Sequence, residues 1–391
     1  MMEQNMNVAY ILHSTEPTDG ASKAFLSMME GLRTCGVCPF AVVPDEGAVT
    51  QLLRKAGVPV LVVNFRASAY PYHNTASQRL WFLPRLLARI LVNRQATKAV
   101  KHFLLQNKID LVHTNSGIVR IGFDAAQKAG IPHIYHIREY SGLIGIRYFP
   151  REAAFLQQLA ASGSYSIFIT KALQQFYGQE GKASSRVIYD GVLDTKEDMP
   201  TVTDKDYFLF AGRIHPAKGI DQLLQAYKQY ATQTEAPLHL KIAGGLDDAD
   251  FVRSQQKFIE DNGLTTLVEL LGNRNDLADL MSKARAMIVA SPFEGFGFCM
   301  PEAQQQGCLV IGRNTSGTKE QLDNAVELTG QEIGLRYETT EQLAQLLKEV
   351  ADRPVSNYDG YTRKAFEVVN QLYTKEKHVR EVWQFYQDIS C

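Results

Sequence analysis

Residues 291–302 read Ser-Pro-Phe-Glu-Gly-Phe-Gly-Phe-Cys-Met-Pro-Glu, and they follow the short apolar run Ala-Met-Ile-Val-Ala at residues 286–290. An apolar run of this length, bounded by turn residues, predicts a buried parallel strand. The two glycines allow the backbone to approach a ligand closely. Pro301 is expected at the first position of a helix, with Glu302 in its first turn. Two glutamates therefore flank a glycine-rich loop at the carboxyl end of a strand, where open α/β sheets bind ligands.

The composition is that of an ordinary globular protein. The chain has 391 residues, of which 45% are hydrophobic and 21% charged, and this length favours two domains. A net charge of −1 gives no general reason to expect nucleic-acid binding. The five cysteines are sparse and odd in number, which favours a reducing cytosol over a disulfide framework. We find neither a basic signal-peptide region at the start nor an apolar run long enough to cross a bilayer, so a cytoplasmic location is expected.

Apolar strands alternate with helical stretches along the whole chain, which predicts doubly wound α/β domains. Residues 194–205 are mostly polar and lack apolar periodicity, so they are expected to form a linker. The resulting domains span residues 1–193 and 206–370, followed by a last helix at residues 371–391. The predicted strands cover residues 8–12, 40–43, 60–63, 109–113, 133–136, 165–170, 186–189, 207–211, 238–243, 268–271, 286–290 and 309–311.

The motif at residues 291–302 has flanking neighbours in a fixed order. Gly212-Arg213 and Lys218-Gly219 lie upstream, and Ser316-Gly317 with Glu320 lies downstream. Taken alone, the loop could be a chance glycine-rich turn between a strand and a helix. With its neighbours it resembles the paired-glutamate signature of retaining GT-B glycosyltransferases of family 4, also named glycosyl transferases group 1. The resemblance covers nearly the whole chain and is strongest from Asp206 to Glu320.

The resemblance implies an α/β protein with the GT-B fold, in which two Rossmann-like domains face each other across a cleft. In this family the last helix crosses back onto the first domain. The implied reaction moves a hexosyl unit from a nucleotide diphosphate sugar to a sugar hydroxyl with retention, here expected on a lipid-linked glycan precursor. No metal or other cofactor is expected. Two alternatives stay open, a catalytically silent GT-B subunit that binds a partner enzyme and a sugar-nucleotide 2-epimerase.

Cations aimed at a leaving diphosphate are an effective way to stabilise its developing charge. Arg213 and Lys218 are the expected cations, because both follow the predicted strand at residues 207–211. By resemblance, Glu302 accepts hydrogen bonds from the ribose hydroxyls and Glu294 lies near the donor sugar. The other positions expected to bind the donor are Gly212, Gly295, Phe296, Gly297 and Phe298. The acidic run at residues 247–250 is expected to cap a helix rather than bind a metal.

The first domain should supply a further phosphate contact and the acceptor side. Gly20 opens a predicted helix after the first strand and can offer N–H groups to an anion, although the family's two adjacent glycines are here Asp19-Gly20. No GxGxxG follows the strand, which disfavours a dinucleotide-binding dehydrogenase. By resemblance His136 lies near the transferred sugar; the alternative is a packed or capping histidine. His113, Arg138 and Glu139 are expected on the acceptor side.

Between Gly47 and Ile109 the chain has ten basic residues and no acidic residue. Within this stretch, residues 80–92 combine leucines and aromatic residues with arginines, a composition that suits a helix at an anionic bilayer surface. The alternative is an amphipathic helix whose bases are simply solvated. A nucleic-acid partner lacks any recognisable motif. A peripheral location at the inner face of the membrane is therefore expected, with the following residues at the lipid surface: Arg79, Trp81, Arg85, Arg89 and Arg94.

Overall fold

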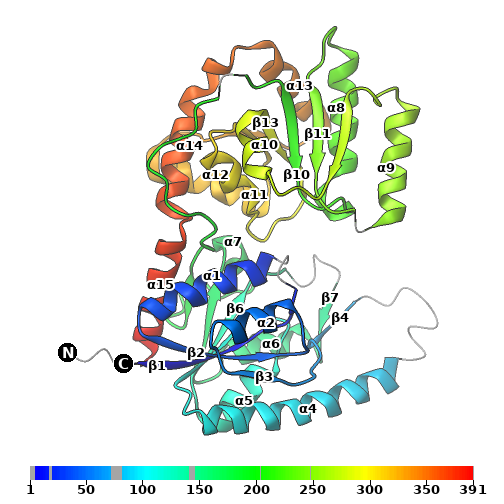
Figure 1. Cartoon of the computed structure of the whole chain (residues 1–391). Coiled ribbons are helices and arrows are strands. Elements are labelled where there is room, and N and C mark those ends of the chain that lie inside the picture. Colours follow the sequence, from blue (N-terminus) through cyan, green and yellow to red (C-terminus); the bar gives the residue numbers. More distant parts are fainter. Residues whose placement is uncertain are drawn as a thin grey trace. The chain divides into compact units, whose positions relative to one another are not determined.

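The computed structural model describes residues 5–16, 20–71, 82–140, 146–202, 204–246 and 248–390. The chain divides into two compact units, shown in Figure 1. Unit 1 contains Met1–Gly191 together with Lys375–Cys391, and unit 2 contains Val192–Thr374. The chain therefore passes from one unit to the other twice. The segment expected as a linker, residues 194–205, belongs to unit 2.

Unit 1 is built on a parallel sheet of seven strands in the order β3-β2-β1-β5-β6-β8-β9. A separate antiparallel ribbon pairs β4 with β7. The order reverses beside β1, as in doubly wound sheets, which bind ligands at this switch point. The strands are β1 (Met6–Ile11), β2 (Val37–Val43), β3 (Val60–Val62), β4 (Ala69–Pro71), β5 (Leu111–Thr114), β6 (His133–Ile137), β7 (Ile146–Tyr148), β8 (Ser164–Phe168) and β9 (Ser185–Val187).

Helices cover both faces of this sheet. One face packs against α1, α2 and α15, with Tyr10 and Phe25 in the shared core. The other packs against α4 and α5, with Ile11 and Val100 in the core. Because neighbouring strand residues point to opposite faces, Tyr10 and Ile11 serve different cores. The helices are α1 (Gly20–Thr34), α2 (Ala48–Lys55), α4 (Phe82–Gln106), α5 (Ile121–Ala129), α6 (Glu152–Leu159), α7 (Lys171–Phe176) and α15 (Lys375–Ser390).

Unit 2 has a parallel sheet of six strands in the order β12-β11-β10-β13-β14-β15. The strands are β10 (Tyr207–Ala211), β11 (His239–Ala243), β12 (Val268–Gly272), β13 (Ala284–Val289), β14 (Val310–Arg313) and β15 (Leu335–Tyr337). The helices are η1 (Pro216–Lys218), α8 (Ile220–Thr232), α9 (Ala249–Asp261), α10 (Leu277–Lys283), α11 (Cys299–Gln305), α12 (Ser316–Thr329), α13 (Thr340–Asp352), η2 (Val355–Tyr358) and α14 (Asp359–Leu372).

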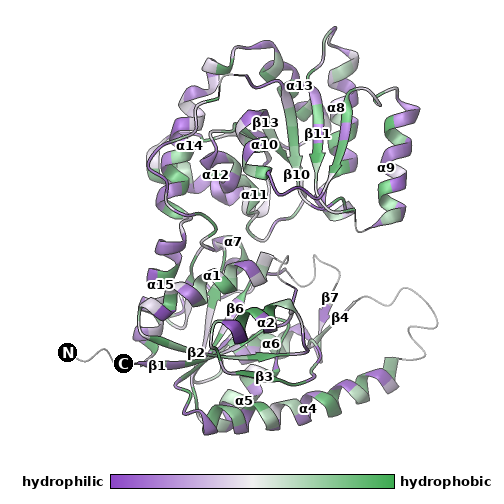
Figure 2. Cartoon of the chain, in the orientation of Figure 1, coloured by the Kyte–Doolittle hydropathy of each residue, from purple (hydrophilic) through white to green (hydrophobic). Residues whose placement is uncertain are grey.

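The central strand β10 of unit 2 is buried on both faces of the sheet. Its residues are apolar almost throughout, as Figure 2 shows, which is typical of a parallel strand buried on both faces. Phe208 and Phe210 pack with α8, α9 and α13. Tyr207 and Leu209 pack with α10, α11, α12 and α14. The prediction of two doubly wound α/β domains is thus confirmed.

The last helix, α15, belongs to unit 1, where it packs along α1. Val382 and Tyr386 are completely buried in the core of that unit. Gly31 of α1 permits the contact, since a Cβ added there would lie 2.4 Å from a methyl group of Val379. The end of the chain is therefore an integral part of the first Rossmann-like domain.

Candidate functional site

The first part of the candidate site is the loop that follows β10. His215 caps η1 by accepting a hydrogen bond from the Ala217 N–H at 3.1 Å, and Lys218 is the last residue of that turn. Gly219 has a φ of +69°, and a Cβ there would lie 2.2 Å from the Ala290 carbonyl oxygen. Only glycine fits this position, because both the backbone conformation and the contact exclude a side chain. Gly219 therefore holds Lys218 against the end of β13.

At this point Lys218 meets the loop that follows β13. Its Nζ lies 2.7 Å from Glu294 Oε1, and Ser291 Oγ donates to the same oxygen at 2.6 Å. The two charged side chains are 25% and 15% exposed, so the pair is sheltered but reachable. Adjacent parallel strands bring both loops to the same edge of the sheet. The structure thus brings together two of the predicted catalytic residues.

Helix α12 fixes the shape of the glycine-aromatic loop. Ser316 Oγ accepts a hydrogen bond from the Glu294 N–H at 2.9 Å, and the Gly317 N–H donates to the Glu294 carbonyl at 3.1 Å. A Cβ on Gly317 would lie 2.7 Å from the Phe296 carbonyl oxygen. Gln321 donates from its side-chain amide to that same carbonyl. The downstream Ser-Gly pair therefore supports the loop directly.

The aromatic residues of this loop differ in role. Phe296 is only 2% exposed and its ring packs against Tyr373, with 5.1 Å between the ring centroids. Phe293 is 49% exposed. Gly297 has a φ of +89°, a conformation that favours glycine. The Phe296 side chain anchors the loop in the core, so only the backbone of this residue is available for a donor sugar.

Glu302 lies in the first turn of α11, as predicted, but this helix begins at Cys299 rather than at Pro301. Pro301 is still compatible with the helix because it stands in the first turn, where its missing N–H is not needed. Burial, with a smaller contribution from the nearby carboxylates of Glu302 and Glu294, raises the pKa of the Cys299 thiol to about 12. Cys299 is therefore a neutral packing residue and not a nucleophile.

Arg213, the second predicted cation, is exposed in the loop between β10 and η1. Among the described residues it has no hydrogen-bond or ion-pair partner. Gly212, which precedes Arg213, is in close backbone contact with Gly244. A Cβ added at Gly244 would lie 1.9 Å from the Gly212 carbonyl oxygen. The loops after β10 and β11 are thus packed backbone to backbone, and the guanidinium of Arg213 is free to bind a ligand.

In unit 1 two of the predicted histidines form a buried chain with a tyrosine from α15. His113 Nδ1 lies 2.6 Å from the Tyr386 hydroxyl, and His113 Nε2 lies 3.1 Å from His136 Nδ1. Both histidines are 0% exposed. Burial and the nearby Arg138 guanidinium hold the pKa of each well below its usual value, so both rings are neutral. Neither ring presents an atom at the surface, and direct contact of His136 with a sugar stays a prediction.

Arg138 and Asp190 form a buried ion pair next to His136. Arg138 Nη2 lies 2.9 Å from Asp190 Oδ1, with side chains that are 7% and 0% exposed. His378 from α15 stacks on His136 at 5.9 Å, and its Nδ1 lies 2.6 Å from the Tyr189 carbonyl oxygen. Asp190 thus provides the counter-charge for Arg138. Sequence reasoning gave Asp190 no role because this partner lies 52 residues upstream.

The remaining predicted residues of unit 1 lie in two places. Glu139 accepts hydrogen bonds from Ser116 Oγ at 2.6 Å and from the Ile118 N–H at 3.1 Å, so its carboxylate shapes the loop after β5. Gly20 is the first residue of α1, where the expected anion-binding N–H groups begin. These positions match the expected acceptor and phosphate sides in sequence order only, and their roles stay predictions.

Three of the five residues predicted at the membrane surface lie on helix α4. Arg85 and Arg94 are exposed, whereas Arg79 and Trp81 lie outside the described residues. Arg89 differs from expectation. Its guanidinium lies 4.3 Å from the centre of the Tyr70 ring and donates to the Ala69 carbonyl oxygen at 3.1 Å. Arg89 therefore holds β4 in place and does not face outward.

Within the described residues, no group of three or more His, Cys, Asp or Glu side chains could hold a metal ion. Asp248 caps α9 by accepting a hydrogen bond from the Phe251 N–H at 3.0 Å. Helix capping thus accounts for this aspartate, while Asp247 lies outside the described residues.

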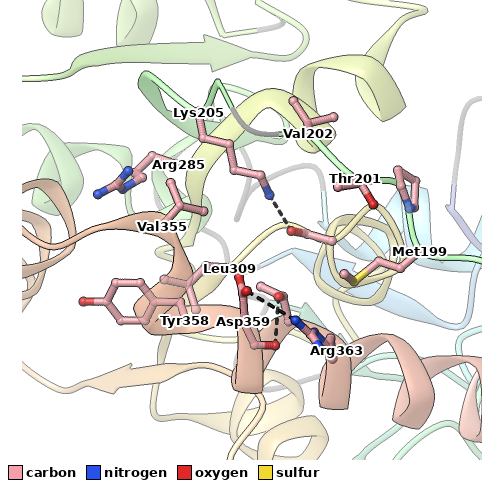
Figure 3. Close-up of a pocket in the computed structure, with 13 residues that line it drawn as sticks. Met199, Thr201, Val202, Lys205, Arg285, Leu309, Val355, Tyr358, Asp359 and Arg363 are labelled. Atoms are coloured by element: carbon pink, nitrogen blue, oxygen red, sulfur yellow. Dashed lines mark hydrogen bonds and ion pairs between the residues drawn. The ribbon is translucent and has the colours of Figure 1, made fainter.

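A small cavity of about 220 Å³ opens in unit 2 between the segment at residues 199–205 and α14, as Figure 3 shows. Lys205 Nζ donates to the Gly307 carbonyl oxygen at 2.6 Å, and Arg285 donates to the Val350 carbonyl oxygen at 2.9 Å. These carbonyls lie at the carboxyl ends of α11 and α13, where a cation is favourable. Lys205 and Arg285 are therefore explained by helix capping, and Arg363 pairs with Asp359 at 3.4 Å, so the cations of this cavity do not call for a ligand.

Two family models match the chain. The model described as "Glycosyl transferases group 1" matches residues 194–364, and "Glycosyl transferase 4-like domain" matches residues 19–182. The chain belongs to the glycosyl transferases group 1 family. The predicted membership of glycosyl transferases group 1 is thus confirmed, while the retaining mechanism stays a prediction. None of the described helices of this group 1 glycosyltransferase is long and apolar enough to span a membrane.

Two curated relatives of this group 1 glycosyltransferase match over three quarters of its length. An uncharacterized glycosyltransferase of Methanocaldococcus jannaschii is 25% identical over 299 residues, which cover 75% of this chain and 80% of the relative. The UDP-Gal:alpha-D-GlcNAc-diphosphoundecaprenol alpha-1,3-galactosyltransferase of Escherichia coli is 22% identical over 317 residues, or 75% of this chain and 78% of the relative.

Solved structures share the fold. Anabaena HepE, in complex with UDP and glucose, superimposes with a TM-score of 0.75 at 17% identity, covering 98% of this chain and 100% of HepE. The sucrose-phosphate synthase of Thermosynechococcus elongatus gives a TM-score of 0.72 at 17% identity, covering 98% and 99%. The group 1 glycosyltransferase described here thus has the GT-B fold, with two Rossmann-like domains.

Proposed function

We propose that this glycosyltransferase moves a hexosyl unit from a uridine diphosphate sugar to a sugar hydroxyl of a lipid-linked glycan precursor, with retention of the anomeric configuration. The observation that supports this most is the ion pair between Lys218 and Glu294 at the carboxyl edge of the unit 2 sheet. Anabaena HepE was solved with UDP and glucose, and the E. coli relative is named for transfer onto a diphosphoundecaprenol-linked sugar. These names support the uridine donor and the lipid-linked acceptor.

In the proposed reaction the cations act on the leaving group. Arg213 is exposed and lacks a partner in the described part of the chain, so it can take a bidentate grip on a phosphate. Lys218 would exchange its contact with Glu294 for a contact with the diphosphate as negative charge develops there. Removing one such charge-stabilising donor from an active site usually costs a factor of about 10²–10³ in turnover. The pair of cations takes the part that a metal ion plays in other phosphate sites.

Retention is proposed to follow from attack on the same face as the departing diphosphate. As the bond between the anomeric carbon and the phosphate oxygen breaks, the acceptor oxygen bonds to that carbon. The acceptor proton passes to the leaving phosphate. Glu294 is held by Lys218 and Ser291, which suits a group that positions and neutralises rather than one that attacks. The Cys299 thiol is neutral and unsuited to attack.

The proposed acceptor agrees with the outward side of α4. Leu83, Leu87 and Leu91 are 66%, 61% and 58% exposed and lie four residues apart, so they share one face of the helix. Lys98 and Lys101 continue the same stripe, in a helix without acidic residues. Exposed leucines beside lysines that have no ion-pair partner among the described residues suit contact with anionic lipid, where apolar burial and charge attraction add together. This stripe, Leu83–Lys101, is termed the outward stripe of α4.

The test is a panel of nucleotide sugars scored for release of free nucleoside diphosphate, with and without membrane extract. The proposal expects release from a uridine diphosphate hexose that rises when the extract is added, with an α-anomeric product detected by NMR. Release of a free 2-epimerised sugar nucleotide would indicate the epimerase alternative. No release from any donor would favour the silent-subunit alternative, although the sheltered ion pair argues against a subunit freed from catalysis.

A further inference from the structure

A second cavity, of about 490 Å³, lies in unit 1 between α4 and α5 beside the ribbon of β4 and β7. This volume is within the range of small-molecule sites, roughly 300–1,000 Å³. Its wall contains four basic side chains, Arg89, Arg94, Arg120 and Lys128, and one acidic side chain, Asp124. The lining therefore carries three more positive than negative charges, and the donor site of unit 2 does not include it.

The basic side chains of the cavity differ in how many of their donor groups already have hydrogen-bond partners. Arg89 donates to the Ala69 carbonyl oxygen and covers the Tyr70 ring, so it is part of the wall. Arg120 uses its Nε to contact both carboxylate oxygens of Asp124, at 3.0 and 3.1 Å. This geometry leaves the two terminal nitrogens of Arg120 for another acceptor.

Arg94 and Lys128 are exposed at the cavity and have no hydrogen-bond or ion-pair partner among the described residues. The other polar side chains are used locally: Asn93 clamps the backbone of Arg66 with two hydrogen bonds of 2.9 Å, and Thr97 donates to the Asn93 carbonyl oxygen. Among the described residues, the lining groups without a partner are thus cationic donors and the Ser68 hydroxyl, and such donors are what an anion requires.

Another part of the lining is aromatic or apolar, and it adjoins Arg89, whose guanidinium covers the Tyr70 ring. Tyr70 packs edge-on against Phe149, with 5.7 Å between the ring centroids, and Ile90 and Pro150 complete this side. The cavity therefore has a basic part and an aromatic part, and it lies on the helix that also carries the outward stripe of leucines. A ligand that fits both parts has a phosphate group joined to an apolar chain.

We propose that this cavity binds the phosphate or diphosphate group of an amphipathic acceptor such as a prenyl diphosphate-linked sugar. This inference rests on the proposed function for its biological ligand, but its chemistry can be tested without the reaction. Arg94, Lys128 and the terminal nitrogens of Arg120 hold the phosphate oxygens, while Tyr70, Ile90 and Phe149 contact the first carbons of the chain. The same surface of α4 then brings the enzyme to the lipid and holds the head of the acceptor.

The experiment titrates the full-length protein with geranyl diphosphate, a short prenyl diphosphate, in the presence of saturating UDP so that the donor site is occupied. The double variant Arg94→Gln with Lys128→Gln is compared with Lys55→Gln combined with Lys228→Gln, which removes the same charge outside the cavity. We expect the first pair to weaken geranyl diphosphate binding at least tenfold and the second to change it less than twofold. Equal effects of the two pairs, or no binding by the parent protein, would overturn the inference.

A parallel titration with inorganic phosphate separates the two sources of the anion. Much weaker binding of inorganic phosphate than of geranyl diphosphate supports a lipid-linked ligand. Equal binding would overturn the amphipathic part of the inference. UDP affinity, measured in the same variants, should stay at the parent value. If the nucleotide-sugar panel shows no transfer while geranyl diphosphate still binds through Arg94 and Lys128, the proposed function fails and the cavity assignment stands.

Discussion

Lys218 Nζ lies 2.7 Å from Glu294 Oε1, although the two residues are 76 positions apart in the sequence. They meet because β10 and β13 are neighbouring parallel strands, whose carboxyl ends share one edge of the sheet. Two supports hold the pair: the left-handed turn at Gly219 and the hydrogen bond from Ser291 to the same glutamate oxygen. A cation and a carboxylate placed in this way can be separated by a ligand that offers a phosphate to the lysine.

Glu302→Gln tests the proposed grip on the nucleotide. A carboxylate that accepts both ribose hydroxyls makes its contact already in the ground state, so its loss should weaken UDP binding by roughly 1.5–3 kcal/mol, the range for hydrogen bonds to charged groups. Isothermal titration with UDP measures this, and Glu260→Gln on the exposed side of α9 serves as the control. Unchanged affinity in Glu302→Gln would limit this residue to a role within its own helix.

Gly219→Ala tests the support beneath Lys218. Gly219 and Gly330 share a φ near +70°, at +69° and +70°, but only Gly219 has a backbone atom close to its missing Cβ. Alanine at Gly330 should cost about 1–2 kcal/mol from the left-handed conformation alone. Alanine at Gly219 should cost more and should also lower turnover, since the loop must move away from Ala290. Similar melting temperatures and similar activities for the two variants would contradict the assigned contact.

The buried histidines predict how the stability of unit 1 depends on pH. Burial lowers the pKa of His133 to about 3, whereas an unfolded histidine titrates near 6.5. Above about pH 6.5 both states are neutral. Below it only the unfolded state takes up the proton, so this residue lowers the free energy of unfolding by about 1.4 kcal/mol per pH unit until about pH 3.

The melting temperature of the parent protein should therefore fall between pH 7.5 and 5.5, and the fall should be smaller in His133→Gln. His102→Gln, at an exposed position of α4, should behave like the parent. An equal fall in parent and His133→Gln would show that His133 is not held neutral by the fold.

The outward stripe of α4 predicts binding to anionic vesicles. Replacing Leu87 and Leu91 by serine removes apolar contact, and Lys98→Gln removes up to about 1 kcal/mol of attraction to the surface. Binding should weaken with salt because the Debye length falls from about 10 Å at 0.1 M to about 3 Å at 1 M. Co-sedimentation with anionic and neutral liposomes measures both effects, with Leu52→Ser on α2 as the control. If the protein pellets equally with both lipids, or with neither, the bases of α4 are only solvated and the predicted membrane contact is wrong.

Much of the fold follows from local sequence patterns. β10 has the predicted bounds, since an apolar run between polar turns leaves little choice of ends. The strands that were not predicted, β4, β7 and β15, have three residues each, and their sequences Ala-Tyr-Pro, Ile-Arg-Tyr and Leu-Arg-Tyr lack an apolar run such as the Val-Leu-Val of β3. Helix α11 starts two residues earlier than predicted, because its N-cap residue Phe298 and the two residues between it and Pro301 carry no capping signal that would mark the start.

The candidate site likewise contains residues that could be placed from the sequence and residues that could not. Lys218 and Glu294 could be placed together from sequence, because both follow strands and strand ends converge. The burial of His113 and His136 could not, because their partner Tyr386 comes from a helix more than 200 residues away. Arg89 was predicted to face lipid from composition, which does not reveal that β4 offers it carbonyl oxygens and an aromatic ring. Contacts with residues that are distant in the sequence produce no periodic pattern from which they could be predicted.

The most direct test of the account is the rate of nucleoside diphosphate release by Lys218→Ala, measured with the best donor of the nucleotide-sugar panel and membrane extract. We expect the rate to fall at least about 100-fold, as for the loss of one donor at a developing negative charge, with little change in melting temperature. Lys228→Ala, an exposed lysine on α8, should keep the parent rate. A near-parent rate in folded Lys218→Ala would contradict the claim that this lysine neutralises the leaving diphosphate.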